Sequence, residues 1–243
     1  MTKNKEKPSD IFEEVVTDYK NVFGREFVSM NLYGSATGDD YRPGKSDINF
    51  MVVVSEEGIE ILDQAFSIVK KWRKRNVAIP LFLTETYIET SMDVFPIEYL
   101  NFKRNYILVF GKDILKDLTF KKEFIRLQCE REIKGKLLLL REAFLESHGK
   151  ARVLKSVVIQ SLSAFIAIFE ALLWFKGEEI PKEKREIIRV TAGVFELDGR
   201  LFEKLLDIKE EKIKLGDTEI SKLYKGYLKE VRMLSKLIDA LGA

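Results

Sequence analysis

The hydrophobic period of this sequence changes once, near residue 121, and the change limits the folds that the chain can adopt. Before it, short apolar runs of strand type alternate with helical patterns and a glycine-rich loop. After it, apolar residues recur at helical spacing. The long helical segments are expected at 121–147, 151–176, 182–206 and 217–241. The pattern predicts an α+β domain over residues 1–118 and a helical bundle over residues 119–243.

The first domain is expected to be a mixed sheet with flanking helices. Strands are expected at 27–33, 48–54, 77–83, 93–100 and 106–110, and helices at 11–23, 55–75 and 84–91. The run INFMVVV at 48–54 is apolar on both faces, which is typical of a covered central strand. Gly24 is expected to end the first helix, since glycine adopts the backbone conformation that a helix terminus requires.

A small, bendable pair, Gly34 and Ser35, lies between the first two strands. Eleven residues separate it from Asp47, and Asn49 follows two positions later. Glycine lets the backbone turn sharply and lets a ligand approach its N–H groups, which can bind phosphate. Residues two apart on a strand point the same way, so Asp47 and Asn49 would present hard oxygen ligands of the kind that Mg²⁺ prefers.

This arrangement resembles the signature of the DNA polymerase β-like nucleotidyltransferase superfamily. That signature is an apolar strand, Gly-Gly or Gly-Ser, about ten residues, and then Asp-hydrophobic-Asp/Glu. The order of helix, strand, loop, strand and helix is similar too, over about the first 110 residues. The helical C-terminal half looks like the second domain of the branch that adenylylates kanamycin and streptomycin, by architecture alone.

The resemblance implies a mechanism in which three carboxylates hold two Mg²⁺ ions on a nucleoside triphosphate such as ATP. Gly34 and Ser35 match the phosphate-holding pair, and Asp47 matches the first carboxylate. Asn49 falls on the second carboxylate and departs from it. An amide keeps a carbonyl oxygen but lacks the negative charge, so the metal site should be weakened and two-metal catalysis is in doubt.

Two residues of the stretch DVFPIEYL, Asp93 and Glu98, are candidates for the third carboxylate. They face opposite sides of a regular strand, and Glu98 is preferred because Asp93 lies where the preceding helix ends. Pro96 could introduce a bulge that changes this parity. Arg42 and Lys45 flank the loop and could reach a triphosphate. Asp39 and Asp40 are interpreted as turn formers.

Two functions therefore remain open on the same fold. The first is Mg²⁺-dependent transfer of a nucleoside monophosphate from a nucleoside triphosphate to a hydroxyl acceptor, with Asp47, Asn49 and Glu98 as metal ligands. The alternative is a catalytically impaired nucleotide-binding or regulatory protein. The sequence does not name the acceptor, which could be a small molecule or a macromolecule, and it leaves the oligomeric state open.

Composition limits the partners and the cellular compartment that we expect for the protein. A net charge of +2 over 243 residues does not favour nucleic acid as a partner, and charged residues at 33% resemble an ion-pair-rich thermophile surface. The single cysteine, Cys129, and the polar N-terminus without a signal-peptide pattern indicate a cytoplasmic protein. The apolar stretch 156–175 is interrupted by polar residues, so we expect a buried core helix and no membrane association.

Overall fold

The structure is a computed structural model that describes residues 7–38, 41–44 and 46–241. The chain forms two compact units. The first comprises Met1–Met92 and Tyr99–Thr119, and the second comprises Asp93–Glu98 and Phe120–Ala243. A short segment in the middle of the chain, 93–98, is thus grouped with the helices of the second unit, which no sequence pattern indicates.

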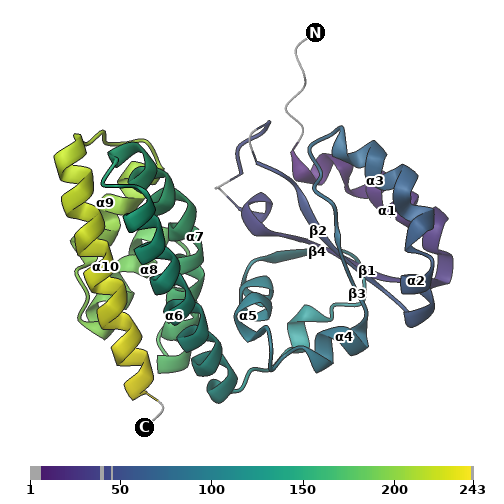
Figure 1. The fold of residues 1–243 in the computed structure, drawn as a ribbon. Coiled ribbons are helices and arrows are strands. Elements are labelled where there is room, and N and C mark those ends of the chain that lie inside the picture. The colour runs from purple at the N-terminus through teal and green to yellow at the C-terminus, as the bar shows by residue number, and fades with distance from the viewer. Residues whose placement is uncertain (1–6, 39–40, 45, 242–243) are drawn as a thin grey trace. The chain divides into compact units, whose positions relative to one another are not determined.

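The first unit contains a four-stranded mixed sheet with the strand order β3-β2-β1-β4 (Figure 1). Its strands are β1 (Phe27–Tyr33), β2 (Asn49–Val54), β3 (Leu81–Leu83) and β4 (Tyr106–Gly111). β1 pairs antiparallel with both β2 and β4, whereas β2 and β3 are parallel. Every β2 residue after Asn49 is buried, as expected for a covered central strand.

The helices of this unit are short, and their bounds refine the sequence expectation. They are α1 (Phe12–Phe23), α2 (Glu56–Glu60), α3 (Phe66–Arg73) and α4 (Glu85–Thr90), together with most of α5 (Pro96–Arg104), whose first three residues are grouped with the second unit. Gly24, with φ 54°, ends α1 as predicted. The helix expected over 55–75 is divided into α2 and α3 by Ile61 and a 3₁₀ turn, Leu62–Ala65, which preserves the apolar face across the break.

The two faces of the sheet differ in chemistry. Met30, Leu32, Phe50 and Val52 belong to a buried apolar cluster that also contains α1 residues. Their neighbours along β1 are polar and point the other way, because strand side chains alternate between faces. Ser29, Asn31 and Tyr33 therefore share the second face of the sheet with Asn49, which pairs with Tyr33.

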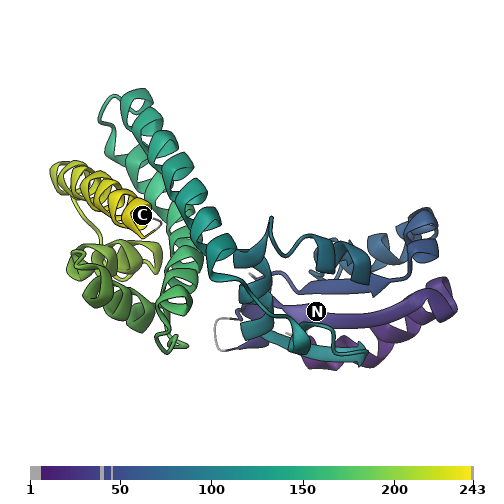
Figure 2. The same ribbon diagram turned by 90° about the horizontal axis from the view of Figure 1, so that it is seen from below.

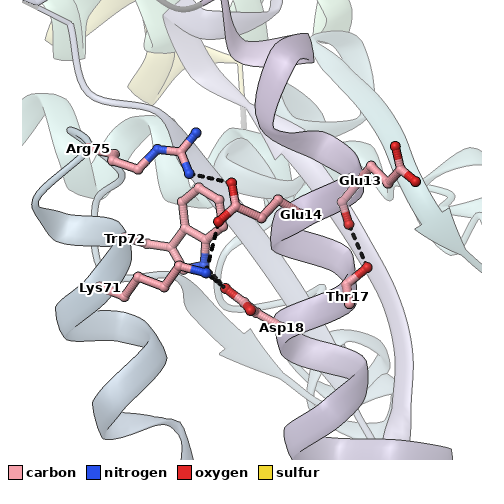
Figure 3. A network of polar contacts seen from close by, with 7 residues as sticks. All are labelled: Glu13, Glu14, Thr17, Asp18, Lys71, Trp72 and Arg75. Atoms are coloured by element: carbon pink, nitrogen blue, oxygen red, sulfur yellow. Dashed lines mark hydrogen bonds and ion pairs between the residues drawn. The ribbon is translucent and has the colours of Figure 1, made fainter.

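Helices α1 and α3 are joined by a polar network beside the apolar cluster (Figure 3). The buried Trp72 donates its indole N–H to Asp18 at 2.8 Å, and Lys71 pairs with the same carboxylate at 2.7 Å. Hydrogen bonds from Lys71 and Arg75 lower the pKa of Glu14. Lys71 and Arg75 are thus both engaged with acids of α1.

The second unit consists of long helices. They are α6 (Lys122–Glu146), α7 (Ala151–Lys176), α8 (Lys184–Phe195), α9 (Gly199–Lys209) and α10 (Asp217–Ala240). Helices α6, α7 and α10 contact one another and lie side by side in both views (Figure 1 and Figure 2). This arrangement confirms the predicted C-terminal helical bundle.

One predicted helix of the bundle is divided. The sequence indicates a single helix over 182–206, but α8 ends at Glu196, which has a left-handed backbone with φ 52°. Asp198 then caps α9, because its side chain accepts a hydrogen bond from Leu201 N–H at 3.1 Å. Glu230 fixes the link by accepting the Asp198 backbone N–H at 2.9 Å. The apolar period continues across the break, so it does not reveal the break.

Helix α7 is the one helix of the described ranges that is long and apolar enough to cross a membrane. Half of its most apolar window is buried inside the protein, and α7 contacts α6, α8, α9 and α10. These contacts agree with the buried core helix expected from the sequence. Length and composition alone are weak indications that a helix spans a membrane.

Candidate functional site

The site begins at the end of β1, where the chain turns at Gly34. Gly34 has φ +78°, a left-handed conformation that residues with a side chain rarely adopt. Thr37 Oγ1 donates a hydrogen bond of 2.8 Å to the Gly34 carbonyl, and the buried Ala36 anchors the turn from inside. Gly34 and Ser35 themselves are exposed, so the outer side of this turn is open to a ligand.

Asp47 and Asn49 lie at the start of β2, on either side of the buried Ile48. Ile48 points into the apolar cluster and forms a parallel bridge with Val77, which fixes the position of this segment. Asp47 is exposed and Asn49 is half-buried. The burial pattern agrees with side chains of Asp47 and Asn49 that both point away from the core.

Asn49 lies near the Gly34 turn. A Cβ atom placed on Gly34 would lie 3.6 Å from Asn49 Nδ2, and the same nitrogen donates a long hydrogen bond of 3.5 Å to the Asp47 carbonyl. The fold thus brings together Gly34, Asp47 and Asn49, which the motif singles out, although fourteen residues lie between Gly34 and Asn49 in the sequence. Tyr33 stays protonated beside them, because burial raises its pKa.

Arg42 and Lys45 were expected to flank the site. Arg42 is exposed and belongs to a turn in which Ser46 N–H donates to the Arg42 carbonyl at 2.8 Å and Ser46 Oγ accepts the Arg42 N–H at 3.1 Å. Lys45 lies outside the described residues, as do Asp39 and Asp40.

The prediction of a strand over 93–100 was wrong. Asp93 lies in a turn, and Pro96 begins helix α5, because proline fits the first position of a helix, where an N–H partner is not required. Asp93 and Glu98 therefore do not lie on one strand, and the alternation of side chains along a strand does not distinguish them.

Glu98 is held by a residue of α6. Gln128, which is buried, donates from Nε2 to Glu98 Oε2 at 2.7 Å and accepts the Ile97 N–H on Oε1 at 2.8 Å. Both partners belong to the second unit, whereas Asp47 and Asn49 belong to the first. Gln128 is not among the site residues predicted from the sequence. Its position among apolar residues of a long helical pattern is the signal that could have done so.

The strand beside Asn49 also offers no carboxylate. Ile48 pairs with Val77 and Met51 pairs with Leu81, so the residues next to Asn49 are Ala78, Ile79 and Pro80. On the other side Asn49 pairs with Tyr33. In the part of the chain that the structure describes, no group of three acidic, histidine or cysteine side chains could hold a metal ion.

These donors do not fit the two Mg²⁺ ions that the resemblance implies. The start of β2 presents one carboxylate and one amide, and the strands on both sides of it present neutral side chains. A pair of divalent ions needs several carboxylates to offset its charge. We therefore derive no catalytic step through a metal pair at this site.

One more polar side chain on this face of the sheet escaped the sequence analysis. Asn31 on β1 is fully buried and donates from Nδ2 to Ser29 Oγ at 3.1 Å, while its Oδ1 has no hydrogen-bond partner in the described part of the chain. The polar positions of the strand SMNLY, two residues apart, are the signal for a polar face.

Comparison with known proteins supports the fold. No protein-family model and no curated protein matches the chain. Among solved structures, it is similar to spectinomycin adenyltransferase AAD(9) from Enterococcus faecialis, which was crystallised with ATP and spectinomycin. The TM-score is 0.50 and the sequence identity is 13%, over 90% of this chain and 99% of that chain. The chain has an α+β nucleotidyltransferase-type fold with a C-terminal helical region.

Proposed function

We propose that the N-terminal unit is a nucleotide-binding module that holds the phosphates of a nucleoside triphosphate, such as ATP, at the Gly34–Ser35 turn. The position of Asn49 Nδ2, 3.6 Å from where a Cβ atom on Gly34 would lie, carries the proposal, because it adds an amide donor beside a glycine turn that is open to solvent. The adenyltransferase of similar fold was crystallised with ATP, which supports a nucleoside triphosphate as the ligand.

Gly34→Ala tests the proposal. The added methyl group strains the backbone at φ +78° and lies close to Asn49, so the turn should shift and nucleotide affinity should fall by about tenfold or more, the equivalent of roughly 1.4 kcal/mol. Gly38→Ala is the matched control, because a Cβ at Gly38 meets nothing within 4 Å and this glycine has a negative φ.

Binding of ATP would be measured by titration calorimetry, with circular dichroism to establish that both variants are folded. Equal affinities in the two variants would contradict the proposed position of the phosphates. A wild-type chain that binds no nucleoside triphosphate, with or without Mg²⁺, would contradict the function itself.

Transfer of a nucleoside monophosphate to a hydroxyl acceptor is the second candidate. It is favoured by the exposed carboxylate of Asp47, two residues before Asn49. The acceptor would be a small molecule with a free hydroxyl, by analogy with the spectinomycin present in the similar structure. Glu98 would have to serve as an additional ligand, although its carboxylate is engaged with Gln128.

Pyrophosphate release distinguishes the two candidates. ATP, Mg²⁺ and a panel of amino-sugar and polyol acceptors would be incubated with the wild-type chain and with Asp47→Asn. Release that depends on an acceptor and is abolished in Asp47→Asn would establish transfer. Binding of ATP without release for any acceptor of the panel would favour the binding module.

A further inference from the structure

The amide of Asn49 has a hydrogen to offer at the turn. An amide nitrogen carries two hydrogens. Asn49 Nδ2 makes one hydrogen bond in the described chain, to the Asp47 carbonyl, and its length of 3.5 Å is at the outer limit for such a bond. This nitrogen lies 3.6 Å from where a Cβ atom on Gly34 would be, so it is near the turn where phosphate oxygens would lie under the proposed function.

A carboxylate at position 49 would act in the opposite way. It would place a negative charge against the turn and would repel phosphate unless a cation lay between the two. An amide creates no such repulsion and can donate directly to a phosphate oxygen. The replacement of acid by amide therefore removes the main electrostatic reason why this site would need a metal ion.

Among the described residues at the start of β2 and on the strands beside it, negative charge is scarce. Tyr33 is paired with Asn49 and stays neutral, and the neighbouring strand contributes Ala78 and Ile79. Arg42 is exposed at the far end of the same loop. Asp47 is the one described acid at the start of β2, and its carboxylate opposes the binding of an anion.

We propose that this site binds the phosphates of a nucleotide directly, through the Gly34 turn and the Asn49 amide, without a resident metal ion. The inference rests on the proposed nucleotide-binding function and specifies the form of the ligand, which is the metal-free nucleotide. It also assigns the Asn49 amide as a hydrogen-bond donor to phosphate rather than as a weakened metal ligand.

The test is titration calorimetry with ATP in EDTA and in excess Mg²⁺. For the wild-type chain we expect the two dissociation constants to agree within about threefold, because the donors act on the phosphates themselves. Asn49→Asp should lower the affinity in EDTA by roughly ten- to a hundredfold and should regain much of it in Mg²⁺, since the cation offsets the new charge.

Two further variants keep the test decisive. Asp47→Asn should strengthen binding in EDTA by several-fold, about the effect of removing one like charge near an anion, whereas a metal-ligand role predicts loss of binding in Mg²⁺. Asn21→Asp introduces the same charge on an exposed position of α1, which packs on the opposite face of the sheet, and should change neither affinity.

The possible outcomes separate the two proposals. Wild-type binding that requires Mg²⁺, or weaker binding of Asp47→Asn in EDTA, would overturn the metal-free inference and leave the nucleotide-binding function in place. No binding under either condition would overturn the function, and the inference with it. Because Asp47 is exposed, its variant remains informative even where Asn49→Asp fails to fold.

Discussion

At the scale of residues, the proposed function depends on single side chains. Position 49 is an example, because an amide and a carboxylate have the same shape and opposite effects on a phosphate. Another example lies in the helices that support the sheet, where the indole N–H of Trp72 links α3 to α1. Trp72 is 1% exposed, so its N–H needs a partner inside the protein, and Asp18 provides it.

Trp72→Phe should destabilise the N-terminal unit. It removes the hydrogen bond to Asp18 and part of a fully buried ring, which together should lower the free energy of unfolding by about 2 kcal/mol. Lys71→Met is the comparison, because its ion pairs are partly exposed and should contribute less than the buried indole hydrogen bond. Urea unfolding followed by far-UV circular dichroism measures both. A Trp72→Phe effect no larger than that of Lys71→Met would show that the indole bond contributes little.

At the scale of elements, the pairing of β4 with β1 requires a glycine at position 111. Gly111 pairs with Ser29 and has φ +81°. A Cβ at this position would lie 2.0 Å from the Val28 carbonyl oxygen, so a side chain would force the backbones of β1 and β4 apart. Since β1 carries the Gly34 turn at its other end, the pairing of β4 with β1 supports the candidate site.

Gly111→Ala should therefore lower the free energy of unfolding by about 2–4 kcal/mol, from backbone strain and steric overlap. Gly135→Ala is the matched control: Gly135 is exposed within α6 with nothing near its Cβ position, and alanine should stabilise the helix by up to about 1 kcal/mol. Thermal melts of the two variants should shift in opposite directions. A shift of both in the same direction would contradict the steric argument.

The elements also show which parts of the fold can be predicted from sequence patterns. Periodicity identifies β1, β2, α1 and the long helices, because each buries a continuous face. It does not identify the break at Glu196, where the apolar period continues through a left-handed residue. It misassigns 93–100, because alternating apolar residues around Pro96 fit a short strand as well as the first turn of a helix. The proximity of Asn49 to Gly34 follows from the motif, whereas the tie from Gln128 to Glu98 depends on tertiary packing.

The whole molecule has two compact units, and each contains one natural reporter. Trp72 lies in the first unit and Trp174 in the second, and these are the two tryptophans of the chain. Cys129, the single cysteine, is fully buried in α6. Burial, with smaller contributions from Glu132 and Glu98, raises the pKa of its thiol. The native thiol should therefore react slowly, and it should become reactive when the second unit unfolds.

These reporters locate nucleotide binding within the molecule. In a Trp174→Phe background, Trp72 fluorescence follows the first unit during urea unfolding, and labelling of Cys129 follows the second. A ligand that binds only the folded first unit stabilises that unit, by about 1.4 kcal/mol at ten times its dissociation constant. We expect ATP to raise the urea midpoint of the Trp72 transition and to leave that of Cys129 labelling almost unchanged. A larger shift in Cys129 labelling would place the nucleotide on the helical unit, and equal shifts would mean that the two units unfold as one cooperative system, because stabilisation of one is then shared by both.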